Sequence, residues 1–210
     1  MFVELVLPQA RLAHAAALME MHHDRKRVFV DALGWQLPSA GSWLEVDEFD
    51  NEHTVYLIAR SAATGKHEGS VRLLPSTARH MLSSMFSGLC AGAVPMGQDC
   101  WEISRLVAAP PDVAGTSLVR VHRILALALA EFADLNSITR YTLVTESHRV
   151  AALLSIGWHV RPLGLPTSWH GQSLQALEVV VDRRTLFELR SKFRVTTSIL
   201  QTSRTDRFAA

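Results

Sequence analysis

The sequence predicts an α/β fold, in which one mixed, twisted β-sheet carries helices on both faces. Two apolar, β-branched runs, residues 54–62 and 68–76, are joined by the turn formers "ATGKH", which is typical of a hairpin. Later strand patterns alternate with helical ones, and this alternation indicates parallel strands as well. With 210 residues, 48% of them hydrophobic, the chain can form the core of one domain.

The elements follow in order along the chain. Phe2–Leu7 is a short apolar strand. A helical pattern follows from about Gln9 to Leu33, with a break expected at "HHDRKR". Its predicted buried side consists of Leu12, Ala15, Ala16, Met19, His22, Phe29 and Leu33. Residues 36–53 are rich in turn formers and acids, so we interpret them as a functional loop.

The second half continues the pattern. Residues 77–90 are amphipathic and predict a helix, and 100–108 predict a strand. The turn "PPDVAGT" precedes a strongly apolar helix over 117–134, and strands at 140–145 and 174–182 precede a helix over 183–193. We expect a single domain over residues 1–194 and a polar, disordered tail over 195–210.

Composition and charge exclude several classes of protein. Lys plus Arg number 21 against 20 Asp plus Glu, so the net charge of +1 does not favour a nucleic-acid partner. Cys90 and Cys100 show no metal-binding spacing, and the neighbouring His22 and His23 cannot place both rings on one ion from a helix, so no metal site is expected. No apolar stretch is long enough to span a membrane and no signal peptide is recognisable, which favours a cytoplasmic location.

Three charges lie where strand formation does not explain them. Arg72 has apolar neighbours in a predicted strand, and its burial would require an acidic partner. Glu102 and Arg105 share the strand "WEISRLVAAP", where alternation sends them to opposite faces. Either a bulge redirects one of them or each has a separate partner. Asp47 and Asp50 of the loop are the obvious partners, and a purely structural salt-bridge network is the alternative to a functional site.

Five segments together resemble a known family. They are "RKRVFVDALGW" (25–35), "VDEFDNEHTVYLIA" (46–59), "GSVRLLPS" (69–76), "MLSSMF" (81–86) and "WEISRLV" (101–107). Their order and spacing resemble the acyl-homoserine-lactone synthases, the autoinducer synthases of bacterial quorum sensing. The family's characteristic residues match here at Arg25, Phe29, Trp35, Asp47, Asp50, Arg72, Glu102 and Arg105.

The resemblance implies an N-acetyltransferase-like fold with a split between two central strands. It also implies an acyltransferase that takes S-adenosylmethionine as its amine substrate and a thioester of acyl carrier protein or coenzyme A as donor, releasing methylthioadenosine. S-adenosylmethionine is then a substrate, and no cofactor is expected.

The resemblance also gives the matching residues their expected roles. Glu102 is the candidate base that deprotonates the substrate amine, and its apolar neighbours should raise its pKa by desolvation. Phe29 and Trp35 would pack around the cationic substrate, and Arg25 suits its carboxylate. Asp47 and Asp50 would supply negative charge near that cation. Arg72 and Arg105 would hold the acidic loop and Glu102 in place, and these four residues complete the expected catalytic set.

An apolar tunnel for the acyl chain is expected from the second half of the chain. Its candidate walls are Leu125, Leu129, Val144, Leu153 and Trp158. Thr142 or Thr145 would correspond to a threonine that favours 3-oxo chains in the family. The segments "RPLGLP" and "LQALEVVVDRRTL" resemble the subset that uses coenzyme A thioesters, whereas a carrier protein would dock on Arg149, Arg161, Arg183 and Arg184.

Two alternatives remain open at this point. One is an N-acetyltransferase that uses acetyl-CoA on another amine, although "PPDVAGTSLVRVH" lacks the usual glycine pattern for pyrophosphate. The other is a non-catalytic relative that senses one of the ligands.

Overall fold

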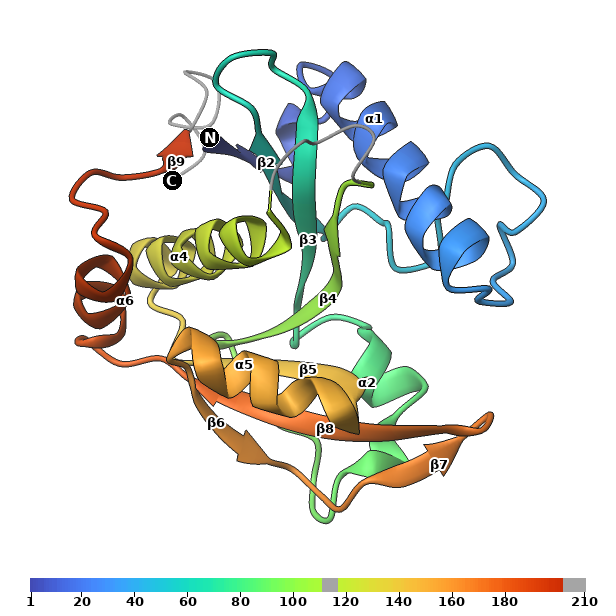
Figure 1. Cartoon of the computed structure of the whole chain (residues 1–210). Helices are drawn as coiled ribbons and strands as arrows, with labels where there is room; N and C mark the ends of the chain where they lie inside the picture. The colour runs from blue at the N-terminus through green and yellow to red at the C-terminus, as the bar shows by residue number, and fades with distance from the viewer. Residues whose placement is uncertain (111–116, 202–210) are drawn as a thin grey trace. The chain divides into compact units, whose positions relative to one another are not determined.

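The computed structural model describes residues 1–110 and 117–201 of the chain (Figure 1). The turn predicted before the long helix lies mostly outside these residues, as does the end of the predicted tail. By internal contacts the chain divides into two compact units. The first comprises 1–72, 105–128 and 197–210, and the second comprises 73–104 and 129–196. Three of the four boundaries fall inside β3, β4 and α4, whose bounds are given below, and the single-domain assignment over 1–194 stays a prediction.

The first unit contains the N-terminal strands and helices. Its elements are β1 (Phe2–Val6), the 3-10 helix Pro8–Ala10, α1 (Ala15–Arg25), a π-helical segment (Lys26–Ala32), β2 (Val55–Arg60), the first part of β3 (His67–Pro75), the last part of β4 (Cys100–Ala108), the first part of α4 (Leu118–Asn136) and β9 (Leu200–Gln201). The strand order within this unit is β4-β3-β2-β1-β9. Strand β1 pairs antiparallel with β2 and parallel with β9.

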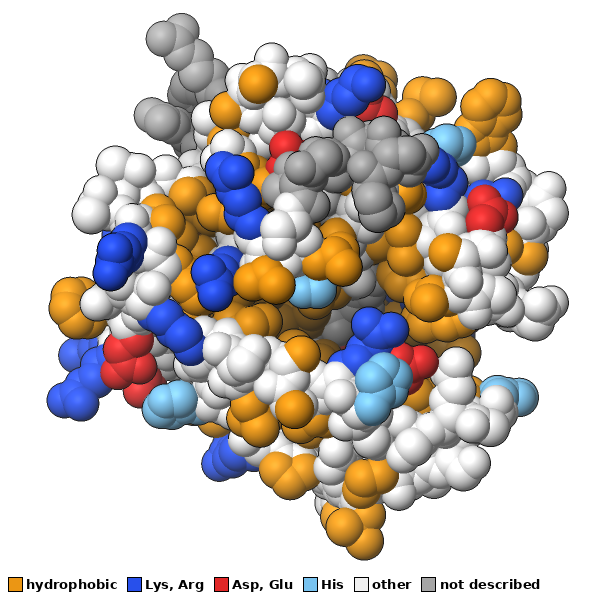
Figure 2. Space-filling model, viewed as in Figure 1, with side chains coloured by type: hydrophobic (Ala, Val, Ile, Leu, Met, Phe, Trp, Pro, Cys, Tyr) orange, Lys and Arg blue, Asp and Glu red, His pale blue; other side chains and the backbone are white. Residues whose placement is uncertain are grey.

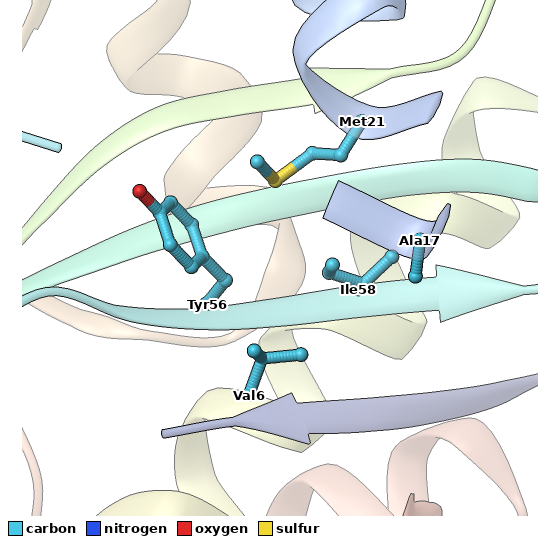
Figure 3. Close-up of a cluster of buried hydrophobic side chains, with 5 residues drawn as sticks. All are labelled: Val6, Ala17, Met21, Tyr56 and Ile58. Atoms are coloured by element: carbon cyan, nitrogen blue, oxygen red, sulfur yellow. The ribbon is translucent and has the colours of Figure 1, made fainter. Parts of the chain in front are cut away.

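Helix α1 packs on the sheet through a small apolar cluster (Figure 3). Met21 and Ala17 of the helix contact Tyr56 and Ile58 of β2 and Val6 of β1. The buried side predicted for residues 9–33 was wrong at Leu12 and Met19, which are 91% and 62% exposed, whereas Phe29 is buried as expected. The face that is buried also carries Asp24 and Arg25, so hydrophobic periodicity alone could not identify it.

The second unit contains the remaining strands. Its elements are the last part of β3, α2 (Met81–Ser84), the 3-10 helix Ser87–Leu89, the first part of β4, the last part of α4, β5 (Arg140–Glu146), the 3-10 helix Ser147–Arg149, α5 (Val150–Ile156), β6 (His159–Pro162), β7 (Thr167–Trp169), β8 (Gln172–Val180) and α6 (Thr185–Phe193). The strand order within this unit is β6-β8-β5-β4-β3, and β7 pairs with β8 (Figure 1).

The predicted mixed sheet is confirmed, and so is the split between central strands. Strands β4 and β5 run parallel, while β8 is antiparallel to β5 and β6. The pairing of β4 with β5 covers only Cys100–Arg140, Trp101–Tyr141 and Glu102–Thr142. Both strands continue beyond the last of these pairs, to Ala108 and Glu146.

Two predicted boundaries need correction. The helix expected over 77–90 is reduced to α2 and one 3-10 turn. Glu102 accepts hydrogen bonds from the N–H groups of Met81 and Leu82, and these bonds favour a helix that begins at Met81. The tail expected to be disordered from residue 195 contains β9, and the Ile199 carbonyl just before this strand accepts a hydrogen bond from the Val3 N–H (2.9 Å). An exposed edge of β1 offers the backbone groups that such pairing needs.

Two further observations concern the surface charges and the helices. In Figure 2 the described Lys and Arg side chains are seen among hydrophobic, polar and acidic ones. Among the helices of the described ranges, none has the length and apolar composition required to cross a bilayer.

Candidate functional site

Six buried charged side chains of the first unit form a closed ring of ion pairs, which we call the charge ring. Around the ring, arginines and acids alternate in the order Arg25, Glu45, Arg105, Asp47, Arg72, Asp50, and Asp50 returns to Arg25. Each guanidinium contacts two carboxylates and each carboxylate contacts two guanidinium groups. Three positive and three negative charges make the ring formally neutral, which suits a buried position.

The contacts of the charge ring are close. Arg25 Nη1 lies 2.9 Å from Asp50 Oδ1, and Arg72 Nη1 lies 3.0 Å from the same oxygen. Arg105 Nη2 lies 3.0 Å from Glu45 Oε1 and 2.6 Å from Asp47 Oδ2. Asp47 is the most exposed member, with 12% of its side chain accessible, so the ring meets solvent mainly at this residue.

Strand and helix geometry bring these residues together. Arg25 ends α1, Arg72 lies on β3 and Arg105 on β4, while the acids come from the loop before β2. Arg105 has a positive φ of 49°, which interrupts the regular strand and redirects its side chain. Of the two arrangements expected for Glu102 and Arg105, the structure therefore shows the local distortion together with separate partners.

The loop itself is held by its own polar groups. The Asp47 N–H donates to Asp50 Oδ2 (2.9 Å), and the Phe49 N–H donates to Asp47 Oδ1 (2.9 Å). Tyr56 donates its hydroxyl to Asp50 Oδ1 (2.8 Å), and the Glu45 N–H donates to the His22 carbonyl (3.1 Å). The two aspartates therefore shape the loop and close the charge ring at once.

Burial and the arginines of the charge ring shift the pKa values of the aspartates in opposite directions. Burial alone would raise the pKa of Asp50, but the guanidinium groups of Arg25 and Arg72 outweigh it and hold this pKa well below its ordinary value. Burial likewise opposes the hydrogen bond and charge of Arg72, which lower the pKa of Asp47. Both carboxylates are therefore ionised at neutral pH.

An aromatic pair adjoins the charge ring. Phe29 and Trp35 stack with ring centroids 4.7 Å apart and planes at 21°. The Arg105 guanidinium carbon lies 5.6 Å from the centroid of Phe29, which is buried, whereas Trp35 is half-buried. The π-helical turn Lys26–Ala32 carries Phe29, and such turns are frequent at functional sites.

The position of Arg25 argues against its expected role. Its side chain is 1% exposed, and its guanidinium is occupied by Glu45 and Asp50. These two carboxylates take the place that we had assigned to the carboxylate of the substrate. Arg25 is thus positioned to hold the acidic loop.

Glu102 lies in the second unit, where it binds the start of α2. It is 1% exposed, and its two oxygens accept hydrogen bonds from the Met81 N–H (2.7 Å) and the Leu82 N–H (2.9 Å). These two bonds fix the orientation of the Glu102 carboxylate at the start of α2. Whether its pKa is raised, as expected from the sequence, stays a prediction.

The register of β5 resolves which threonine shares a face with Glu102. Thr142 is the direct partner of Glu102 and is fully buried, so both side chains lie on the same face of the sheet. Alternation sends Thr145 to the other face, together with Tyr141, whose hydroxyl donates to the Leu129 carbonyl of α4 (2.9 Å).

A buried apolar cluster lies on the same face as Glu102. It is formed by Leu82, Leu89, Leu174 and Ala176, with Phe86, Cys90, Val94, Val144 and Leu163 packed against it. Of the predicted tunnel walls, Val144 therefore belongs to this cluster. The others lie elsewhere: Leu125 and Leu129 on α4, Leu153 on α5 and Trp158 after the end of α5.

Sequence reasoning missed Glu45, which completes the charge ring. Its side chain is 0% exposed and binds both Arg25 and Arg105. The signal was present, because Glu45 stands between Leu44 and Val46 just as Arg72 stands between apolar neighbours. The apolar cluster was also missed, since its members come from segments without a shared periodicity.

Comparison with solved structures first identifies the kind of fold. An acyl-CoA N-acyltransferase from Pseudomonas aeruginosa aligns with a TM-score of 0.54 at 16% identity, over 84% of this chain and 97% of that one. This likeness concerns the fold alone, and it confirms the predicted N-acetyltransferase-like architecture. The charge ring and the split sheet are thus set in an acyltransferase fold.

The family follows from the sequence comparison. The family model of the autoinducer synthases matches residues 9–189, and the chain belongs to that family. An acyl-homoserine-lactone synthase of Ralstonia nicotianae is 42% identical over 88 residues, which are 41% of this chain and 43% of that relative. The match therefore spans less than half the length of that protein.

A solved relative covers nearly the whole chain. The CoA-dependent acyl-homoserine lactone synthase BjaI, in complex with S-adenosylmethionine and isopentyl-CoA, is 26% identical with a TM-score of 0.85. The alignment covers 99% of this chain and 97% of that one.

Proposed function

We propose that the protein is an acyl-homoserine-lactone synthase, which joins the amine of S-adenosylmethionine to an acyl thioester and then closes the lactone with release of methylthioadenosine. The observation that carries this proposal is the complete charge ring with its stacked aromatic pair, in a chain that belongs to the autoinducer synthase family. The solved relative that binds S-adenosylmethionine and an acyl-CoA over almost the same length supports it.

Acyl transfer requires a neutral amine. An α-amine has a pKa of about 8, so a modest base suffices near neutral pH. We assign this role to Glu102, whose carboxylate is buried and held by the backbone amides of Met81 and Leu82. Glu102 acts on the amine directly or through one water molecule.

Lactone closure needs orientation more than acid–base chemistry, because the carboxylate displaces the sulfonium group within one molecule. We assign the sulfonium to the neighbourhood of Phe29 and Trp35, where ring faces attract cations. The charge ring fixes the loop that carries Asp47 and holds Arg105 against Phe29. Its members are positioning residues in this account.

For the donor, we propose a coenzyme A thioester as the first to test. The apolar cluster that includes Leu82, Val144 and Leu174 is the surface we assign to the acyl chain. Thr142 shares the face of Glu102, so it is the threonine that would meet the 3-position of that chain. Acyl carrier protein is the alternative donor.

We also propose that the enzyme works in the cytoplasm. Cys90 and Cys100 are both free thiols, which suits a reducing compartment.

The test is an assay of methylthioadenosine release by the purified protein. We expect release only when S-adenosylmethionine and an acyl thioester are both present. No release with short and long acyl donors, on either coenzyme A or acyl carrier protein, would contradict the proposal.

A further inference from the structure

Four polar residues form a row across the sheet of the second unit. Glu102 of β4 is the direct partner of Thr142 of β5, Thr142 is the partner of Glu178 of β8, and Glu178 is the partner of Arg161 of β6. Directly paired residues point to the same face of a sheet, with Cβ atoms about 4.5–5.5 Å apart in antiparallel pairs. We call these four residues the polar row.

The polar row leads from the interior to solvent. Glu102 is 1% exposed, Thr142 0% and Glu178 5%, whereas the side chain of Arg161 is 66% exposed. Glu178 forms an ion pair with Arg161, and β6, which carries Arg161, is the edge strand of this unit. The row therefore runs along one face of the sheet from the proposed base to the surface.

Packing does not explain why a threonine occupies position 142. The Thr142 hydroxyl is buried and has no hydrogen-bond partner among the residues that the structure describes, although a carboxylate lies on each side of it in the register. A valine of the same shape would avoid this unsatisfied group. A hydroxyl can accept one proton while it donates another, which is the property a relay needs.

Other ionisable groups adjoin the row. The buried His80 precedes Met81, whose N–H binds Glu102, and His159 lies two residues before Arg161 on the same face of β6. Cys100 and Arg140 lie two residues before Glu102 and Thr142 on the same face, and Arg140 binds Asp99 at 3.1 Å. Burial raises the pKa of the Cys100 thiol, so it does not compete for protons at neutral pH. Arg140 stays cationic, and Glu178 is the next carboxylate along the row beyond Thr142.

We propose that the polar row conducts to solvent the proton that acyl transfer releases. When the amine arrives as an ammonium ion, the C–N bond forms, the thioester C–S bond breaks, and two protons leave nitrogen. One proton neutralises the thiolate. The other passes from Glu102 to the Thr142 hydroxyl, which hands its own proton to Glu178, and Glu178 releases it beside Arg161. This inference rests on the proposed function.

The experiment measures kcat in weak and in strong buffer, with a saturated acyl donor, so that recognition of a 3-oxo group does not enter. We expect Glu178→Gln and Thr142→Val to lower kcat about tenfold or more in weak buffer, with both KM values nearly unchanged. Imidazole at high concentration should restore the rate, because a diffusible base replaces the relay. Thr142→Ser keeps a hydroxyl, so it should lose less of kcat in weak buffer than Thr142→Val does.

Glu131→Gln is the matched control, because Glu131 is also a buried carboxylate, 2.9 Å from a partly exposed arginine, Arg190, but lies on α4 away from the row. The kcat of this control variant should be the same in weak and in strong buffer. Wild-type kcat in both row variants, or a loss that imidazole does not restore, would overturn the relay. Thr142→Val decides the matter if Glu178→Gln does not fold. Failure of the wild-type protein to release methylthioadenosine would instead contradict the proposed function.

Discussion

Arg105 and Asp47 form a 2.6 Å ion pair although 58 positions separate them in the sequence. The pair joins a central strand to the acidic loop and completes the charge ring on the side nearest solvent. Arg105 reaches Asp47 from a left-handed backbone conformation, which non-glycine residues adopt at an expense of about 1–3 kcal/mol. The ion pairs of this arginine must outweigh that strain.

This conformation predicts an unusual order of stability at position 105. Both Arg105→Gly and Arg105→Ala remove the guanidinium, but only glycine accepts a φ of 49° without strain. The glycine variant should be more stable than the alanine variant by about 1 kcal/mol in chemical denaturation. Within regular strands an alanine variant is ordinarily more stable than a glycine variant. An alanine variant that is more stable at position 105 would therefore contradict the left-handed conformation.

Removal of Glu45 should destabilise the protein strongly. Glu45→Gln leaves Arg25 and Arg105 each with one carboxylate partner in a buried site. Breaking a buried ion pair on one side costs about 3–5 kcal/mol, so a loss in this range is expected in the free energy of unfolding. Glu52→Gln is the control, because the side chain of Glu52 is 80% exposed. Equal effects of the two changes would mean that the charge ring does not stabilise the fold.

The aspartates of the charge ring predict a loss of stability in acid. The pKa values of Asp47 and Asp50 are lowered in the folded protein, while unfolded aspartate titrates near 3.9. Below about pH 5 the unfolded chain binds more protons, so stability falls as the pH decreases towards the folded pKa values. Thermal unfolding between pH 7 and 3 measures this slope. Asp50→Asn should flatten it; an unchanged slope would place the acid sensitivity elsewhere.

Glu102→Gln should separate binding from chemistry. The amide retains the size of the side chain but cannot take a proton, so kcat should fall about 10²–10⁴-fold. Affinity for S-adenosylmethionine, measured by calorimetry, should change little. An equal loss of affinity and turnover would assign Glu102 a purely structural role at the start of α2.

Sequence analysis predicted the parts of the fold that local pattern determines. The strands β2, β3, β5 and β8 follow from β-branched runs, and α4 follows from its long apolar pattern. The buried face of α1 could not be predicted in this way, because Asp24 and Arg25 are buried by distant partners. Strand β9 was also missed, since its pairing with β1 depends on tertiary placement.

The candidate site was likewise predictable only in part. The arginines and Asp47 and Asp50 were identified because their charges did not fit their surroundings or matched the family. Their closure into a ring depends on Glu45 and on the backbone of Arg105, and neither follows from residue spacing. The polar row likewise required the strand registers, which a sequence without its structure does not provide.

The central claim is lactone synthesis from two substrates, and product stoichiometry tests it most directly. Mass spectrometry of a reaction with S-adenosylmethionine and an acyl-CoA should detect N-acyl-homoserine lactone, methylthioadenosine and free thiol in equal amounts. Release of thiol without methylthioadenosine, together with an open-chain amide product, would indicate an ordinary N-acyltransferase and contradict lactone synthesis.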